Sequence, residues 1–152
     1  MKNDQEYIIV EIIPEAISPD KGNLVQISAL RLKGLQLLDR FDCRLSEDKI
    51  CNLDIRELIS YDVDKFQYFD STKSLLDSFQ KWVVDLPIYI LDNEYTKNFL
   101  ASISNEKRMI HDVLGMEYSD DFIDKIIDKY HLEPSNYIVD LLYEAFIYES
   151  NH

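Results

Sequence analysis

The side chains of this 152-residue chain that could do chemistry are mostly carboxylates, with 29 Asp and Glu against 16 Lys and Arg and a formal net charge of −13. One of them, Glu11, lies inside the apolar, β-branched run of residues 7–13. A carboxylate is costly to bury unless it is paired or solvated, so we expect Glu11 to sit at a strand exit on the sheet edge. The acidic stretch 117–124 lacks the central glycine of a calcium loop and is typical of a helix start.

Other kinds of site are disfavoured by residue spacing. Cys43 and Cys51 form neither a C-x-x-C motif nor a zinc pattern and are expected to be reduced thiols. The three histidines make no H-x-x-x-H or H-E-x-x-H pair, and the three glycines are too scattered for a phosphate-binding loop. Carboxylate chemistry is therefore the kind that the sequence leaves open.

Composition favours one globular domain over residues 1–152. The chain is 46% hydrophobic, with 10 Tyr, 7 Phe and 1 Trp, so it can bury a core without disulfides or metals. Charged residues interrupt every apolar run before the roughly 18 residues of a membrane span, and we expect a cytoplasmic protein with no membrane partner. The negative charge disfavours a nucleic-acid coat, because neutralising many phosphates requires a basic surface.

These residues must be positioned by a β-rich first third followed by alternating helices and strands. We predict strands at 7–13, 24–33, 35–45, 87–91 and 108–112, and helices at 54–60, from 71 to 83, from about 93, and at 119–131 and 136–149. The second and third strands follow each other through a turn at Gly34 and should pair antiparallel. Strands joined through helices then predict a mixed sheet with helices packed on it, in the α/β class.

That element order, with several local segments, resembles one enzyme family. The segments are residues 7–13, the turn 19–29, the stretch 87–100 ending in Asn98-Phe99-Leu100, and the last helix 136–149. Together they resemble the DEDDh branch of the ribonuclease-H-like 3'-5' exonucleases, the DnaQ-like proofreading family, over nearly the whole chain. The resemblance implies a ribonuclease-H-like mixed sheet, an antiparallel three-stranded meander plus parallel strands, flanked by α-helices.

The resemblance also implies a chemistry, two-metal phosphodiester hydrolysis. Two divalent cations clamp the scissile phosphate and activate a water, so carboxylates must hold about four positive charges and a base must accept a proton. In the family, the first strand supplies an Asp and, two residues later, a Glu. A second Asp begins the helix after the fourth main strand, and a third lies on the last helix, five residues after the His that acts as base.

Placed on this chain, the family's functional positions are largely changed. The first acid falls on Glu11 and the Glu two residues later on Ile13; the second Asp falls on Thr96, the base on Ser135 and the third Asp on Asp140. Only the last keeps its residue, and the first keeps only its charge. The resemblance thus implies the fold with a degenerate active site.

Metal binding at these positions is predicted to be weak. Glu11 and Asp140 are the candidate metal ligands, with Asp92 or Glu94 close by in the sequence of the second motif. Two carboxylates could hold one hydrated Mg²⁺ weakly, whereas the mechanism needs two metals and a base. We therefore expect no cofactor, with Mg²⁺ or Mn²⁺ bound only if residual nuclease activity exists.

Three functions remain open. The favoured hypothesis is a catalytically eroded exonuclease fold that binds a protein partner or a nucleic-acid end. The first alternative is a metal-dependent 3'-5' exonuclease with ligands rearranged among Glu11, Asp92 or Glu94, and Asp140. The second is an acidic module that mimics phosphate and binds a basic protein.

Overall fold

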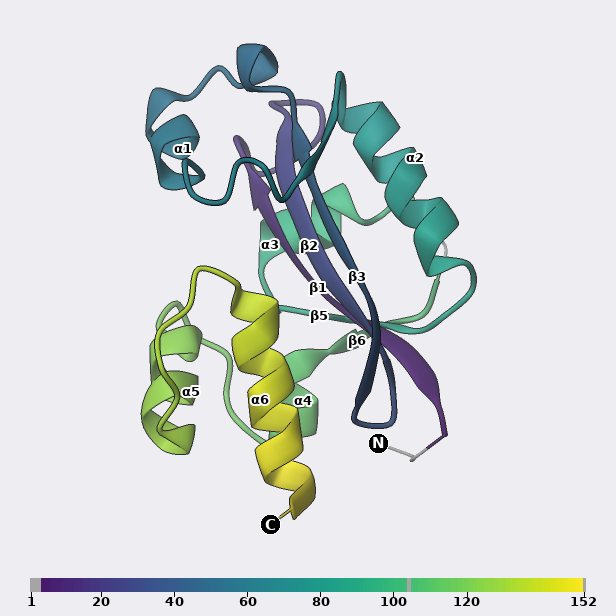
Figure 1. Cartoon of the computed structure of the whole chain (residues 1–152), viewed down its shortest axis with the longest axis vertical. Coiled ribbons are helices and arrows are strands. Elements are labelled where there is room, and N and C mark those ends of the chain that lie inside the picture. The colour runs from purple at the N-terminus through teal and green to yellow at the C-terminus, as the bar shows by residue number, and fades with distance from the viewer. Residues whose placement is uncertain (1–3, 104, 152) are drawn as a thin grey trace.

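Strand β1 (Glu6–Pro14) lies in the interior of a six-stranded sheet of order β4-β3-β2-β1-β5-β6 in the computed structural model, which describes residues 4–103 and 105–151 (Figure 1). Strands β1, β2 (Leu24–Lys33) and β3 (Gln36–Leu45) form an antiparallel meander. The short strands β5 (Ile88–Ile90), β6 (Lys107–Met109) and β4 (Gln67–Phe69) join it in parallel. The predicted mixed sheet of the α/β class is confirmed.

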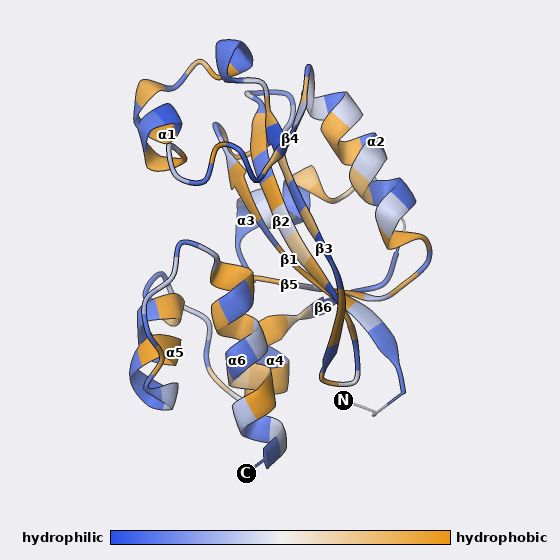
Figure 2. Cartoon of the chain, viewed as in Figure 1, coloured by the Kyte–Doolittle hydropathy of each residue, from blue (hydrophilic) through white to orange (hydrophobic). Residues whose placement is uncertain are grey.

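Helices cover both faces of the sheet because side chains alternate along the strands. On one face, α4 (Ile110–Leu114), α5 (Phe122–Tyr130) and α6 (Ile138–Asn151) pack against Tyr7, Ile9, Leu30 and Leu32. On the other, α2 (Thr72–Val83) and α3 (Glu94–Phe99) pack against a second set of apolar strand residues, Ile8, Val10, Ala29 and Phe41. Apolar residues accordingly prevail along β1 and β2, whereas hydrophilic residues interrupt β3 and alternate with apolar ones around the helices (Figure 2).

A third, smaller apolar cluster lies at the far end of the meander. There the 3-10 helix η1 (Glu47–Lys49) and α1 (Leu53–Leu58) follow β3, and Val25, Leu45, Ile50 and Ile59 pack together. Asn52 caps α1, since its side chain accepts a hydrogen bond from the Ile55 amide at 3.1 Å. The same end of the sheet holds a cavity lined in part by Leu45, Ile50 and Ile59.

Two parts of the predicted element order differ from the structure. Strand β4 was not predicted; it has only three residues, too few for an alternation pattern to be seen, and it is held by its pairing with Cys43 to Leu45 of β3. The strand predicted at 108–112 was wrong in its second half, because β6 ends at Met109 and Ile110 begins α4. Within the described residues, no helix is long and apolar enough to cross a membrane.

Candidate functional site

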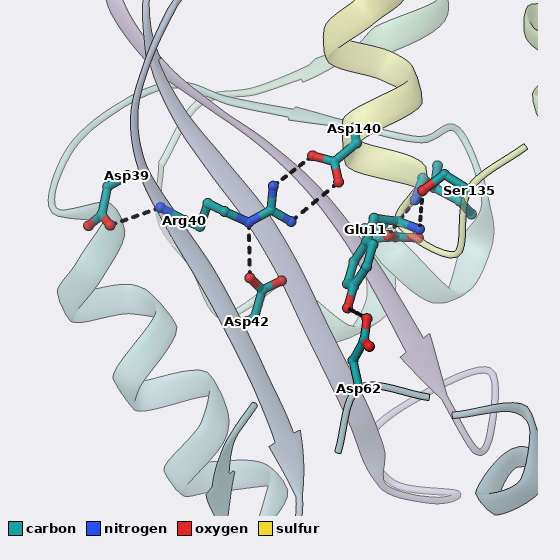
Figure 3. A network of polar contacts seen from close by, with 9 residues as sticks. Glu11, Asp39, Arg40, Asp42, Asp62, Ser135 and Asp140 are labelled. Atoms are coloured by element: carbon teal, nitrogen blue, oxygen red, sulfur yellow. Dashed lines mark hydrogen bonds and ion pairs between the residues drawn. The ribbon is translucent and has the colours of Figure 1, made fainter. Parts of the chain in front are cut away.

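Glu11 is buried in the middle of the fold, and the expectation that it lies at a sheet edge is wrong. Its side chain is on an interior strand and the residue is 4% exposed. Glu11 pairs with Ser28 of β2, but strand β5 pairs with β1 only at Ile8 and Ile9. Glu11 therefore lies beyond the part of β1 that β5 covers, and α6 packs over it. Its Oε1 accepts a hydrogen bond from the Ile138 amide at 2.8 Å, at the first turn of α6 (Figure 3). The start of this helix was predicted at residue 136, but its contact with Glu11 was not; it supplies the partner that permits burial.

The environment of Glu11 favours its protonated form. Burial raises the pKa of its carboxyl from 4.5 to about 8, and the negative charges of Asp140 and Asp42 act in the same direction. Hydrogen bonds from the amides of Ile138 and Val139 lower the pKa without cancelling the effect of burial. Near neutral pH the side chain is therefore mostly a neutral acid, which is a poor metal ligand.

Asp140, on α6, forms an ion pair with Arg40 of β3. Arg40 on β3 donates from Nη1 to Asp140 Oδ1 at 2.7 Å and from Nη2 to Oδ2 at 3.5 Å, while its Nε lies 3.1 Å from Asp42 Oδ2 (Figure 3). The guanidinium also lies over the Tyr137 ring, 5.5 Å from its centroid. The Asp140 carboxylate thus accepts from two nitrogens of one guanidinium, a bidentate ion pair that is stronger than a single contact.

The three chemically changed positions have structural roles. Ile13 packs against the apolar cluster at the end of the meander. Thr96 is buried in α3, whose first turn is capped by Asn93 through a 3.0 Å hydrogen bond to the Thr96 amide. Ser135 is exposed, and its Oγ accepts from the Tyr137 amide at 3.0 Å just before α6. None of these side chains can replace a carboxylate ligand or an imidazole base.

The two neighbouring acids of the second motif do not join Glu11. Asp92 pairs with Lys97 and lies 3.1 Å from His111 Nε2, and the Lys97 contact, followed by His111, lowers the pKa of its carboxyl. Glu94 is exposed on the first turn of α3. The charges that act on Glu11 are those of Asp140 and Asp42 instead.

A groove of about 480 Å³ brings several of the predicted positions together. Glu11, Ile13 and Ser135 line it, with Tyr95 from α3 and Ile138 from α6. The Asp140 carboxylate turns instead toward Arg40 (Figure 3). Among residues 4–103 and 105–151, no group of three or more His, Cys, Asp or Glu side chains is placed to hold a metal ion.

Arg40 was missed by the sequence reasoning. Nothing in its local sequence marks it, because it lies 100 residues from Asp140 along the chain. Only the sheet order and the register of β3 bring the two side chains together, so the signal is in the topology and not in a motif.

Comparisons with known proteins identify the fold. No protein-family model matches the chain, and no curated protein matches its sequence significantly. Among solved structures, it superimposes on zinc-bound exonuclease I of E. coli with single-stranded DNA at a TM-score of 0.59 and 12% identity, covering 96% of this chain and 40% of that one. A product-bound exonuclease I gives 0.60 and 12%, covering 96% and 43%, and E. coli exonuclease I with a dT13 oligonucleotide gives 0.59 and 13%, covering 97% and 41%.

The chain therefore spans about two fifths of the length of these exonucleases. At this low identity the likeness concerns the fold, over almost all of the present chain. This protein has the ribonuclease-H-like fold of exonuclease I, as the resemblance of its sequence implied.

Proposed function

We propose that this protein uses an exonuclease fold for binding and does not cleave nucleic acid. The observation that carries the proposal is that both acidic positions kept from the exonuclease pattern are satisfied from within the chain. Glu11 accepts from the start of α6, and Asp140 is paired with Arg40. A metal would have to displace these partners before it could bind.

Electrostatics supports this reading. A dication bound to Asp140 would lie close to the Arg40 guanidinium, which is always charged, and the two cations would repel each other. Glu11, with a pKa raised to about 8, would have to lose a proton at neutral pH before it could contribute a negative charge. A second metal has no ligand at Ile13, which is part of an apolar cluster.

The lack of a general base at Ser135 also supports the proposal that the protein does not cleave nucleic acid. The exonuclease mechanism needs a group that accepts a proton from the attacking water near neutral pH. Ser135 stands where the resemblance places that base, and a serine hydroxyl cannot accept the proton. Asp92 and His111 do form a carboxylate and imidazole pair, but they contact each other and not Glu11 or Asp140.

The groove beside Glu11 is the surface best suited to a partner. Its walls are mostly apolar, with Ile13, Tyr95, Ile123 and Ile127 among them. Glu11, Ile13 and Ser135, which the sequence resemblance places in the site, also line it. Among the matched exonuclease I structures, one holds single-stranded DNA and another a dT13 oligonucleotide. A nucleic-acid end or an apolar segment of a protein is accordingly the proposed occupant, and an extended phosphate backbone is disfavoured by the net charge of −13.

Digestion of end-labelled single-stranded DNA and RNA with Mg²⁺ or Mn²⁺ tests the proposal. We expect no shortening from the 3' end by the wild type or by Asp140→Ala. Metal-dependent shortening that is lost in Asp140→Ala and kept in Glu57→Ala, an exposed acid on α1 outside the candidate ligands, would establish the exonuclease with rearranged ligands instead. Fluorescence anisotropy with the same oligonucleotides then separates the occupants. Salt-sensitive capture of a basic protein with no oligonucleotide binding would support the phosphate-mimicking alternative.

A further inference from the structure

A second cavity, of about 350 Å³, lies at the end of the meander where β3 leads into η1. It is enclosed by the end of β3, by η1 and α1, and by the segment 59–68, and two arginines, Arg44 and Arg56, line it. This volume falls within the range of small-molecule sites in proteins. The groove at Glu11 is lined by a different set of residues.

Arg44 is a buried cation with one unused donor. The residue is 1% exposed; its Nε donates to Gln26 Oε1 at 2.7 Å and its Nη1 to the Tyr61 carbonyl at 3.0 Å. The guanidinium stacks over Phe66, 3.6 Å from the ring centroid. Its Nη2 is buried and has no hydrogen-bond partner among the described residues. A buried donor on a charged group without a partner is costly, so its presence calls for an acceptor that the chain does not supply.

Arg56 brings a second guanidinium to the same cavity. Its Nη2 donates to the Ile50 carbonyl at 2.6 Å, whereas its Nε is buried and unpartnered within the described part of the chain. Across residues 4–103 and 105–151, neither Arg44 nor Arg56 forms an ion pair. Two guanidinium groups and one carboxylate, that of Glu47, line the cavity, so its wall carries a net positive charge in a protein with 29 acidic residues.

The rest of the wall is largely apolar, with polar groups contributed by Ser46, Glu47, Ser60 and Tyr68. Leu45, Ile50, Ile59 and Val63 line the cavity, and Val63 and Tyr68 are 50% and 42% exposed. The occupant must therefore satisfy guanidinium donors at one end and bury apolar surface at the other. Planar guanidinium groups match the paired oxygens of carboxylates and phosphates.

We propose that this cavity binds a small organic anion, a carboxylate or a phosphate monoester joined to a compact apolar group. The anionic oxygens accept hydrogen bonds from Arg56 and compensate the charge of the buried Arg44, and the apolar group packs against Ile50, Ile59 and Val63. Binding neutralises the buried guanidinium charge and shields it from water, where such hydrogen bonds are strongest.

Titration calorimetry with benzoate and with phenyl phosphate tests the proposal, with phenol as the neutral probe. We expect saturable binding of at least one of the two anions, and the stronger one identifies which head group the cavity takes. Arg56→Gln should weaken that binding about tenfold, as expected for the loss of one charged hydrogen-bond partner. Arg108→Gln removes an equal charge on β6, outside the cavity lining, and should leave the affinity unchanged.

Three results would overturn the proposal. They are no saturable binding of either anion, equal binding of phenol, and equal weakening by the Arg56→Gln and Arg108→Gln substitutions. Circular dichroism establishes that each variant is folded, and if Arg56→Gln is not, Arg56→Lys serves in its place because it keeps the charge and loses the planar donor pair. Retained wild-type affinity in a folded Arg56→Lys or Arg56→Gln variant would also contradict the assigned contact.

Discussion

Replacing Glu11 by Gln isolates the electrostatic cost of the buried carboxyl at the candidate site. The pKa of Glu11 rises from 4.5 to about 8 on folding, so the native chain binds a proton that the unfolded chain releases between these pH values. Stability must then fall as the pH rises through this window, by about 1.4 kcal/mol per pH unit. Below pH 4.5 the carboxyl is protonated in both states, and above about pH 8 the full cost is present.

The size of this effect is large for a protein of 152 residues. A shift from 4.5 to about 8 corresponds to about 5 kcal/mol between the two ends of the window. The residue is only 4% exposed, so solvent screens it little. Total stabilities of such domains are about 5–15 kcal/mol, so the titration of this single carboxyl should be visible in the whole unfolding curve.

Glu11→Gln removes the titration and keeps an oxygen that accepts from the Ile138 amide. We expect the free energy of unfolding of the variant, minus that of the wild type, to rise steadily from about pH 5 to about pH 8 and then level off. Urea unfolding followed by circular dichroism at several pH values measures this difference. Histidines and surface acids titrate in both proteins and cancel in the subtraction.

Glu94→Gln provides the control, because it makes the same substitution at an exposed position and leaves the buried carboxyl of Glu11 in place. A flat difference for Glu11→Gln would refute the argument, since it would mean that the carboxyl has a similar pKa in the folded and unfolded chains. A difference that falls with pH would show that the α6 amides outweigh burial and hold Glu11 as an anion.

Further perturbations test the rest of the site and the fold. Arg40→Met leaves the Asp140 and Asp42 carboxylates without their shared cation, and should lower the free energy of unfolding by about 1–3 kcal/mol in urea titrations, less than for a fully buried pair because the Arg40 side chain is 28% exposed. If Arg40 competes with metals, Mn²⁺ should raise the melting temperature of this variant more than that of the wild type. Asn93→Ala should cost about 1 kcal/mol through loss of the α3 cap, with Glu94→Ala as the neutral comparison in the same unfolding assay. Phe79→Ala should cost about 3–5 kcal/mol, because the ring is fully buried between α2 and the sheet; a loss below 1 kcal/mol would contradict that packing.

The elements of this fold were predictable where local pattern and burial coincide. The apolar runs of β1 and β2 and the helical face of α2, with Leu75, Phe79 and Val83 inward, appear in the sequence as they do in the structure. Ser71 and Asn93 cap the helices that they were expected to begin. Each of these features depends on neighbours within a few residues, which is what sequence periodicity reports.

The details of the candidate site depend on contacts between distant segments, and these could not be predicted. Glu11 meets the Ile138 amide 127 positions away, and Arg40 meets Asp140 100 positions away. The sequence indicates that a carboxylate in an apolar strand needs a partner, but a backbone amide at a helix start leaves no mark on residue types. For that reason the edge position was expected for Glu11, and the buried position was found.

The ribonuclease-H-like fold gathers carboxylates at the ends of β1 and α6, and like charges so placed must be balanced. Exonucleases of the family that the sequence resembles use two dications for this purpose. Here one guanidinium, that of Arg40, offsets part of the charge of Asp140 and Asp42, and the remaining acid, Glu11, reduces the repulsion by taking up a proton beside the start of α6. Because Arg40 is covalently part of β3 and cannot be exchanged with solvent, the cation that pairs with these two carboxylates is supplied by the chain itself.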